Sequence, residues 1–100
     1  MMQVLIVEDL SETRRWLSEV TTTAFPDCTI HDAASQSSGL AQLARRDYAL
    51  ALIDLGLPDG SGLEVLRKMR LSQPDVTCVV TTVMGDDASI VGALSAAADG

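Results

Sequence analysis

The feature that most constrains the fold is the presence of short runs made only of apolar residues. Two such runs span residues 4–7 and 49–53, and neither contains a polar position. Strands without polar alternation are typical of a sheet whose two faces are both covered by helices. Segments with helical spacing of apolar residues separate these runs. This alternation predicts an α/β fold with a doubly wound parallel sheet and right-handed crossovers.

Four strand–helix units fit the chain and indicate one domain over residues 1–100. The expected strands are residues 4–7, 28–32, 49–53 and 76–82. The first expected helix is capped by Ser11 and ends before Pro26, and the others are residues 35–46, 62–72 and 87–98. The helical residues expected to face the sheet or the core are Trp16, Leu17, Val20, Ala24, Leu40, Leu43, Ala44, Leu63, Leu66 and Met69.

Charge and composition argue against several classes of function. The formal net charge of -7 is unsuited to direct nucleic-acid binding, which needs clustered lysine and arginine. No apolar run approaches the ~18 residues of a membrane span, and no signal-peptide pattern follows the first residue. Cys28 and Cys78 lack metal-ligand spacing and are expected to be buried thiols, and His31 is expected to be structural or on the surface. The chain is therefore predicted to be a cytoplasmic domain without membrane contact.

Three carboxylates follow predicted strands at the point where each strand ends. Glu8 and Asp9 come directly after the first strand, and Asp54 comes after the third. Because the carboxyl ends of parallel strands open onto one edge of the sheet, we expect these side chains to form one acidic pocket. Carboxylates so close together repel one another, and a divalent cation relieves that repulsion. Mg²⁺ is the expected cation, since it takes oxygen ligands in an octahedron.

Two further segments reach the same edge. The loop after Asp54 holds three glycines between residues 56 and 62, which indicates tight turns and close approach of the backbone to an ion. The backbone carbonyl of Gly56 is a candidate metal ligand. The fourth strand ends in Thr81 and Thr82, where a hydroxyl would donate a hydrogen bond to an oxyanion held at Asp54. Alternation along the strand leaves open which threonine faces the pocket.

Taken together, these motifs resemble the receiver domain of two-component response regulators, the CheY-like family with a flavodoxin-like fold. The matching stretches are residues 4–9, 52–62, 79–82 and 96–100, and they follow the order of the family along the chain. The resemblance implies a phosphorylation-controlled signalling switch and not an enzyme.

The resemblance also implies a role for each residue at the acidic edge. Asp54 would be the phosphoacceptor, which receives a phosphoryl group from a sensor histidine kinase. Glu8 and Asp9 would bind Mg²⁺ together with Asp54 and the Gly56 carbonyl, and Thr82 would contact the phosphoryl group and move on activation. The expected output is transcription regulation through an attached or partner DNA-binding effector.

The family continues with a fifth strand and helix, which carry an aromatic switch residue and a lysine that pairs with the phosphate. This chain ends at Gly100, before either residue, so the sequence is expected to be a C-terminally truncated receiver. Lys68 lies on the predicted third helix and does not replace that lysine. Without a fifth strand the apolar fourth strand is expected to be an exposed edge, which favours self-association through residues 76–82.

Three other functions fit the sequence less well than a phosphoacceptor. A degenerate receiver would act as a phosphorylation-independent interaction module, and the intact acidic triplet argues against it. A nucleotide- or flavin-binding domain needs a glycine-rich turn after the first strand, where this chain has the acidic pair Glu8 and Asp9. A phosphotransfer hydrolase with an Asp-x-Asp motif is disfavoured because Leu55 and Gly56 follow Asp54.

Overall fold

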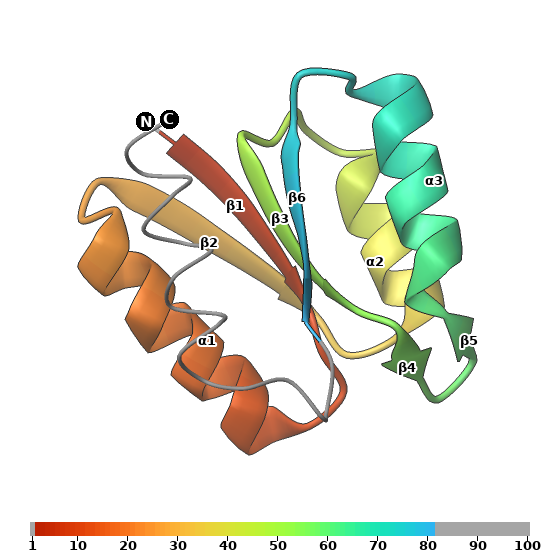
Figure 1. Cartoon of the computed structure of the whole chain (residues 1–100), viewed down its shortest axis with the longest axis horizontal. Helices are drawn as coiled ribbons and strands as arrows, with labels where there is room; N and C mark the ends of the chain where they lie inside the picture. The colour runs from red at the N-terminus through yellow and green to blue at the C-terminus, as the bar shows by residue number, and fades with distance from the viewer. Residues whose placement is uncertain (1, 82–100) are drawn as a thin grey trace.

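A parallel β-sheet lies between two helical layers in this molecule (Figure 1). The computed structural model describes residues 2–81, and residues 1 and 82–100 lie outside the described part. Helix α1 covers one face of the sheet, and α2 and α3 cover the other. The elements in chain order are β1 Met2–Val7, α1 Ser11–Ala24, β2 Cys28–Ala33, α2 Gln36–Leu43, β3 Leu50–Asp54, β4 Gly56–Leu57, β5 Gly60–Ser61, α3 Gly62–Ser72 and β6 Thr77–Thr81.

The main sheet has the strand order β2-β1-β3-β6, and every pairing in it is parallel. This order confirms the predicted doubly wound parallel sheet. The chain leaves β1 through α1 toward β2, and then returns through α2 to β3 on the other side of β1. The crossovers therefore diverge between the carboxyl ends of β1 and β3, which is where open α/β sheets bind ligands.

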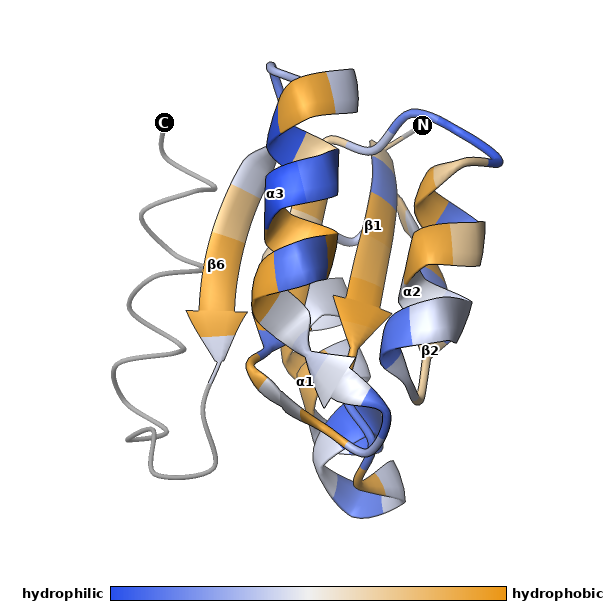
Figure 2. Ribbon diagram, turned by 90° about the vertical axis from the view of Figure 1, so that its right-hand side faces the viewer, coloured by the Kyte–Doolittle hydropathy of each residue, from blue (hydrophilic) through white to orange (hydrophobic). Residues whose placement is uncertain are grey.

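The two central strands are apolar on both faces, as their sequences predict. Alternate residues of β1 and β3 point to opposite helical layers, which gives two core clusters. Val4, Ile6, Leu50 and Leu52 pack with Leu17 of α1, whereas Leu5, Val7, Ala51 and Ile53 pack with Val65 and Met69 of α3. Figure 2 shows the apolar colour of β1 and β6 beside the hydrophilic bands of α3.

Some details of the helices differ from the sequence-based expectations. Ser11 is the first residue of α1 and does not cap it, since the N-cap is Leu10, which makes no side-chain cap bond. Leu63 was expected to face the sheet but is 40% exposed, because Val65 and Met69 take the buried face of α3. Ala44 is exposed because α2 ends one residue before it.

The expectations for the cysteines, the histidine and membrane contact have different outcomes. Cys28 and Cys78 are free thiols that are half-buried, so they are less enclosed than predicted. His31 has a structural contact, because its Nε2 shares a hydrogen bond of 2.8 Å with Oε1 of Gln3.

None of the helices formed by residues 2–81 is long and apolar enough to cross a membrane. The helix predicted over residues 87–98 lies outside the described residues.

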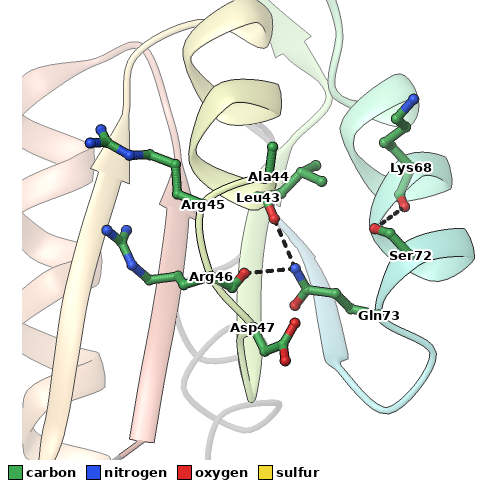
Figure 3. Close-up of a pocket in the computed structure, with 8 residues that line it drawn as sticks. All are labelled: Leu43, Ala44, Arg45, Arg46, Asp47, Lys68, Ser72 and Gln73. Atoms are coloured by element: carbon green, nitrogen blue, oxygen red, sulfur yellow. Dashed lines mark hydrogen bonds between the residues drawn. The ribbon is translucent and has the colours of Figure 1, made fainter.

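At the amino edge of the sheet, one buried amide joins the ends of α2 and α3 (Figure 3). Nε2 of Gln73 donates to the carbonyl oxygens of Leu43 at 2.9 Å and of Arg46 at 2.8 Å. Its Oε1 accepts a hydrogen bond of 2.7 Å from the backbone N–H of Tyr48. Gln73 therefore satisfies three backbone groups of the segment that leads from α2 into β3.

Replacing Gln73 with alanine is expected to lower the free energy of unfolding by about 2–4 kcal/mol, since buried backbone groups lose their partners. The measurement is urea-induced unfolding. Ser72→Ala is the matched control, because that exposed hydroxyl bonds only the Lys68 carbonyl among the described residues, and a change within about 0.5 kcal/mol is expected. Equal losses in the two variants would contradict the role assigned to Gln73.

Candidate metal centre

Three carboxylates meet at the carboxyl edge of β1 and β3. Val7 pairs with Ile53 at the ends of the two strands, so the next residues, Glu8 and Asp54, come side by side. One ligand oxygen from each of Glu8, Asp9 and Asp54 lies within 4.8 Å of the others. Glu8 is 3% exposed and Asp54 is 1% exposed, while Asp9 is half-buried. The structure thus brings together the acidic residues that the sequence placed at this edge.

The burial of Glu8 makes its negative charge unfavourable. Burial is the largest cause that raises the pKa of Glu8 from 4.5 to about 7. The backbone N–H of Leu10 donates to its Oε1 at 3.1 Å and opposes that rise, whereas Asp54 and Asp9 add to it. A cation in the pocket would favour the ionised form of Glu8 and remove the repulsion among the three side chains.

The carboxylate of Asp54 is only partly satisfied by the protein. Its Oδ1 accepts a hydrogen bond of 3.1 Å from the backbone N–H of Gly56. Its Oδ2 is buried without a hydrogen-bond partner in the described chain, although buried polar atoms nearly always have one. An orphaned carboxylate oxygen beside two further carboxylates fits a hard divalent cation such as Mg²⁺, which prefers oxygen ligands.

A threonine pairs with Asp54 on the neighbouring strand. Asp54 pairs with Thr81 in the register of β3 and β6. The side chain of Thr81 is buried, and within residues 2–81 its Oγ1 has no hydrogen-bond partner. The sequence left open whether Thr81 or Thr82 faces the pocket; Thr81 adjoins Asp54, and Thr82 lies outside the described residues.

Close packing fixes the segment that follows Asp54. The backbone N–H of Gly62 donates to the carbonyl of Leu55 at 3.0 Å, so α3 begins directly against the end of β3. A Cβ atom on Gly62 would overlap the carbonyl oxygen of Asp54, and glycine is therefore required there. Gly56 is different, because a Cβ on it would meet no atom closer than Oδ1 of Asp54 at 4.0 Å.

Arg14 supports the acidic turn, a role that the sequence did not reveal. Its side chain is half-buried on α1. Its guanidinium donates to the backbone carbonyl of Glu8 at 2.9 Å and lies 3.5 Å from the carboxylate of Asp32. No spacing in the sequence signals this contact, because Asp32 comes from β2.

Similarity to known proteins extends over nearly the whole chain. The family model described as the response regulator receiver domain matches residues 4–100. The KDP operon transcriptional regulatory protein KdpE of Escherichia coli is 35% identical over 99 residues, which are 99% of this chain and 43% of KdpE. The DNA-binding transcriptional activator DevR/DosR of Mycobacterium tuberculosis is 30% identical over 101 residues, with 100% of this chain and 46% of that protein covered. The chain spans less than half the length of these relatives.

Solved structures agree with the sequence comparison. A CheY-like response regulator receiver domain protein from Methanospirillum hungatei has a TM-score of 0.75 at 26% identity, with 98% of this chain and 75% of that chain covered. TrrA of Thermotoga maritima, solved in complex with Mg²⁺-BeF, has a TM-score of 0.74 at 26% identity, with 99% and 83% covered. These similarities confirm the predicted CheY-like fold.

The raised pKa of Glu8 leads to a prediction for stability in the absence of divalent cations. The folded protein keeps a proton on Glu8 that the unfolded chain releases near pH 4.5. This contribution to stability is therefore complete below pH 4.5 and is lost as the pH rises through about 7. Unfolding by denaturant across this pH range measures the expected loss.

Two comparisons test the origin of that pH dependence. Glu8→Gln does not titrate at this position and is expected to show a smaller loss of stability over the same range. Saturating Mg²⁺ is expected to cancel the loss in the unchanged protein, since it binds the ionised carboxylates. An identical pH dependence with and without Mg²⁺ would count against a cation at this pocket.

Proposed function

Because the chain belongs to the family of response regulator receiver domains, we propose that Asp54 is its phosphoacceptor in a two-component system. The observation that carries this proposal is the buried Oδ2 of Asp54, which has no hydrogen-bond partner among residues 2–81 and lies in an acidic pocket. Receiver domains are signalling domains, so the expected result of the reaction is a change of state in the protein.

The proposed metal ligands are carboxylate oxygens of Glu8, Asp9 and Asp54 together with the backbone carbonyl of Gly56. The clustering of the three carboxylates supports this set, as does the Mg²⁺-BeF complex of the similar protein TrrA. When bound, Mg²⁺ would offset the negative charge that otherwise repels an incoming phosphoryl group.

The proposed reaction is transfer of a phosphoryl group from a phosphohistidine of a sensor histidine kinase. A carboxylate oxygen of Asp54 attacks the phosphorus, and a new O–P bond forms as the N–P bond of the donor breaks. The electron pair of the broken bond stays on the imidazole nitrogen of the kinase. The backbone N–H of Gly56 orients the Asp54 carboxylate through Oδ1 during this step.

Hydroxyl groups at the end of the fourth main strand complete the proposed site. The family resemblance assigns the contact with the phosphoryl group to Thr82. Thr81 supports a polar surrounding for the same group, because it pairs with Asp54 in the sheet and its buried hydroxyl is unsatisfied within the described chain. The hydroxyl of either residue is able to donate a hydrogen bond to a phosphoryl oxygen.

The proposed output is transcription regulation through a DNA-binding effector. Two similar proteins support it by name, since KdpE is a transcriptional regulatory protein and DevR/DosR a DNA-binding activator. With a net charge of -7, this domain is unsuited to hold DNA itself. A cytoplasmic location and self-association through residues 76–82 stay predictions.

Phosphorylation at Asp54 is tested by incubating the intact protein with acetyl phosphate and Mg²⁺ and measuring its mass. A gain of one phosphoryl group is expected, and Asp54→Asn is expected to abolish it because the amide is not a nucleophile. Asp9→Asn is expected to raise the Mg²⁺ concentration required by about tenfold or more.

Asp75→Asn is the control for the change in charge, because Asp75 is exposed and precedes β6 at the opposite edge of the sheet. This variant is expected to gain mass as the unchanged protein does. A gain that needs no divalent cation, or that persists in Asp54→Asn, would rule out the proposed site.

A further inference from the structure

The loop between Asp54 and α3 is a small antiparallel hairpin that begins at the acidic pocket. Gly56 pairs with Ser61 and Leu57 pairs with Gly60, which makes the strands β4 and β5. Gly56, at the base of the hairpin, bonds the carboxylate of Asp54, and Asp59 lies in the turn at its tip. The base and the tip are therefore parts of one hydrogen-bonded hairpin.

The tip is held by the first residues of α2. One carboxylate oxygen of Asp59 accepts a hydrogen bond of 2.6 Å from the backbone N–H of Gln36. The other oxygen accepts one of 3.0 Å from the backbone N–H of Ser37. These two N–H groups have no partner within the helix, and a negative charge is favourable at this end. The bonds from Ser37 and Gln36 lower the pKa of Asp59, so the exposed carboxylate stays ionised at neutral pH.

A second contact runs from α2 back to the hairpin. Nε2 of Gln36 donates to the backbone carbonyl of Ser61 at 2.9 Å. Its amide group also lies over Gly60, where a Cβ atom would come within 2.7 Å of Nε2. Gly60 has φ of +152°, a backbone conformation that favours glycine. We call this set of contacts among Asp59, Gln36 and Ser61 the hairpin clasp.

The clasp does more than cap a helix. Ser35 already caps α2, since its side-chain oxygen accepts a hydrogen bond of 3.1 Å from the backbone N–H of Ser38. The bonds from Asp59 come instead from the loop that carries Gly56. Ser61, the residue that Gln36 holds, is the direct partner of Gly56 in the hairpin. The clasp thus holds Ser61, the hairpin partner of Gly56, whose carbonyl is the proposed metal ligand.

We propose that Asp59 and Gln36 are positioning residues that fix the Gly56 backbone for cation binding beside Asp54. This inference rests on the proposed function, because it concerns the same pocket. Gly56 is exposed and has no side chain to pack, so its backbone depends on the hairpin for its orientation. Holding a ligand group in place before binding removes the entropy cost of ordering it.

The test measures Mg²⁺ affinity by titration calorimetry in the intact protein, beside the Mg²⁺ dependence of Asp54 phosphorylation. Asp59→Ala is expected to weaken Mg²⁺ binding about 3- to 10-fold, with a smaller change in the phosphorylation rate at saturating Mg²⁺. Asp59→Asn keeps one acceptor oxygen for the α2 amides, and an intermediate effect is expected. Gln36→Ala is expected to weaken binding in the same direction.

Asp75→Ala is the matched control, since it removes the same charge at the far edge of the sheet, and unchanged Mg²⁺ affinity is expected. A purely structural role predicts that Asp59→Ala lowers the unfolding midpoint but binds Mg²⁺ as tightly as the unchanged protein, and that result would overturn the proposal. If Asp59→Ala does not fold, the Mg²⁺ affinities of Asp59→Asn and Gln36→Ala test the proposal in its place.

The two proposals fail in different ways. If the unchanged protein binds Mg²⁺ but is not phosphorylated at Asp54, the proposed function fails. The comparison of Mg²⁺ affinities still decides the clasp in that case. If the unchanged protein is phosphorylated and the clasp variants match it in Mg²⁺ affinity, only the clasp is overturned.

Discussion

The parallel pairing of β1 with β3 is the constraint on which the rest of the structure depends. Both strands are buried on two faces, and complete burial of one aliphatic side chain contributes about 1.5–3 kcal/mol. A slip by one residue would exchange the residues that face α1 with those that face α2 and α3. The register that pairs Val7 with Ile53 is therefore strongly favoured, and it places Glu8 beside Asp54.

The burial that stabilises the core makes the adjoining site electrostatically unfavourable. Glu8 and Asp54 are almost without solvent although both are acidic, and one oxygen of Asp54 lacks a partner among the described residues. Buried acidic groups and unsatisfied polar atoms of this kind are concentrated at functional sites. A bound cation would relieve them here, because the repulsion that weakens the metal-free fold would favour occupation of the pocket. In our proposal the hairpin clasp fixes the backbone of Gly56 at this pocket, because Gly56 has no side chain to pack.

Much of this arrangement could be predicted from local patterns. The apolar runs predict the strands, and a carboxylate directly after a strand predicts a position at the carboxyl edge. The errors arose where neighbouring elements decide the outcome. Leu63 has helical spacing but lies outside the face that Val65 and Met69 occupy. Arg14 and Asp59 look like ordinary surface charges, because their partners lie on other elements of the fold.

The sequence by itself determined the class of fold and the identity of the acidic residues at the sheet edge, because apolar periodicity and strand ends are local properties. Only the tertiary structure decided how these residues interact. Burial raises the pKa of Glu8, and one oxygen of Asp54 has no hydrogen-bond partner among the described residues. Asp59 accepts hydrogen bonds from backbone N–H groups of α2. Each of these features requires segments distant in sequence to meet. Burial and long-range hydrogen bonds depend on the packed arrangement of the whole domain, and no single stretch of sequence encodes them.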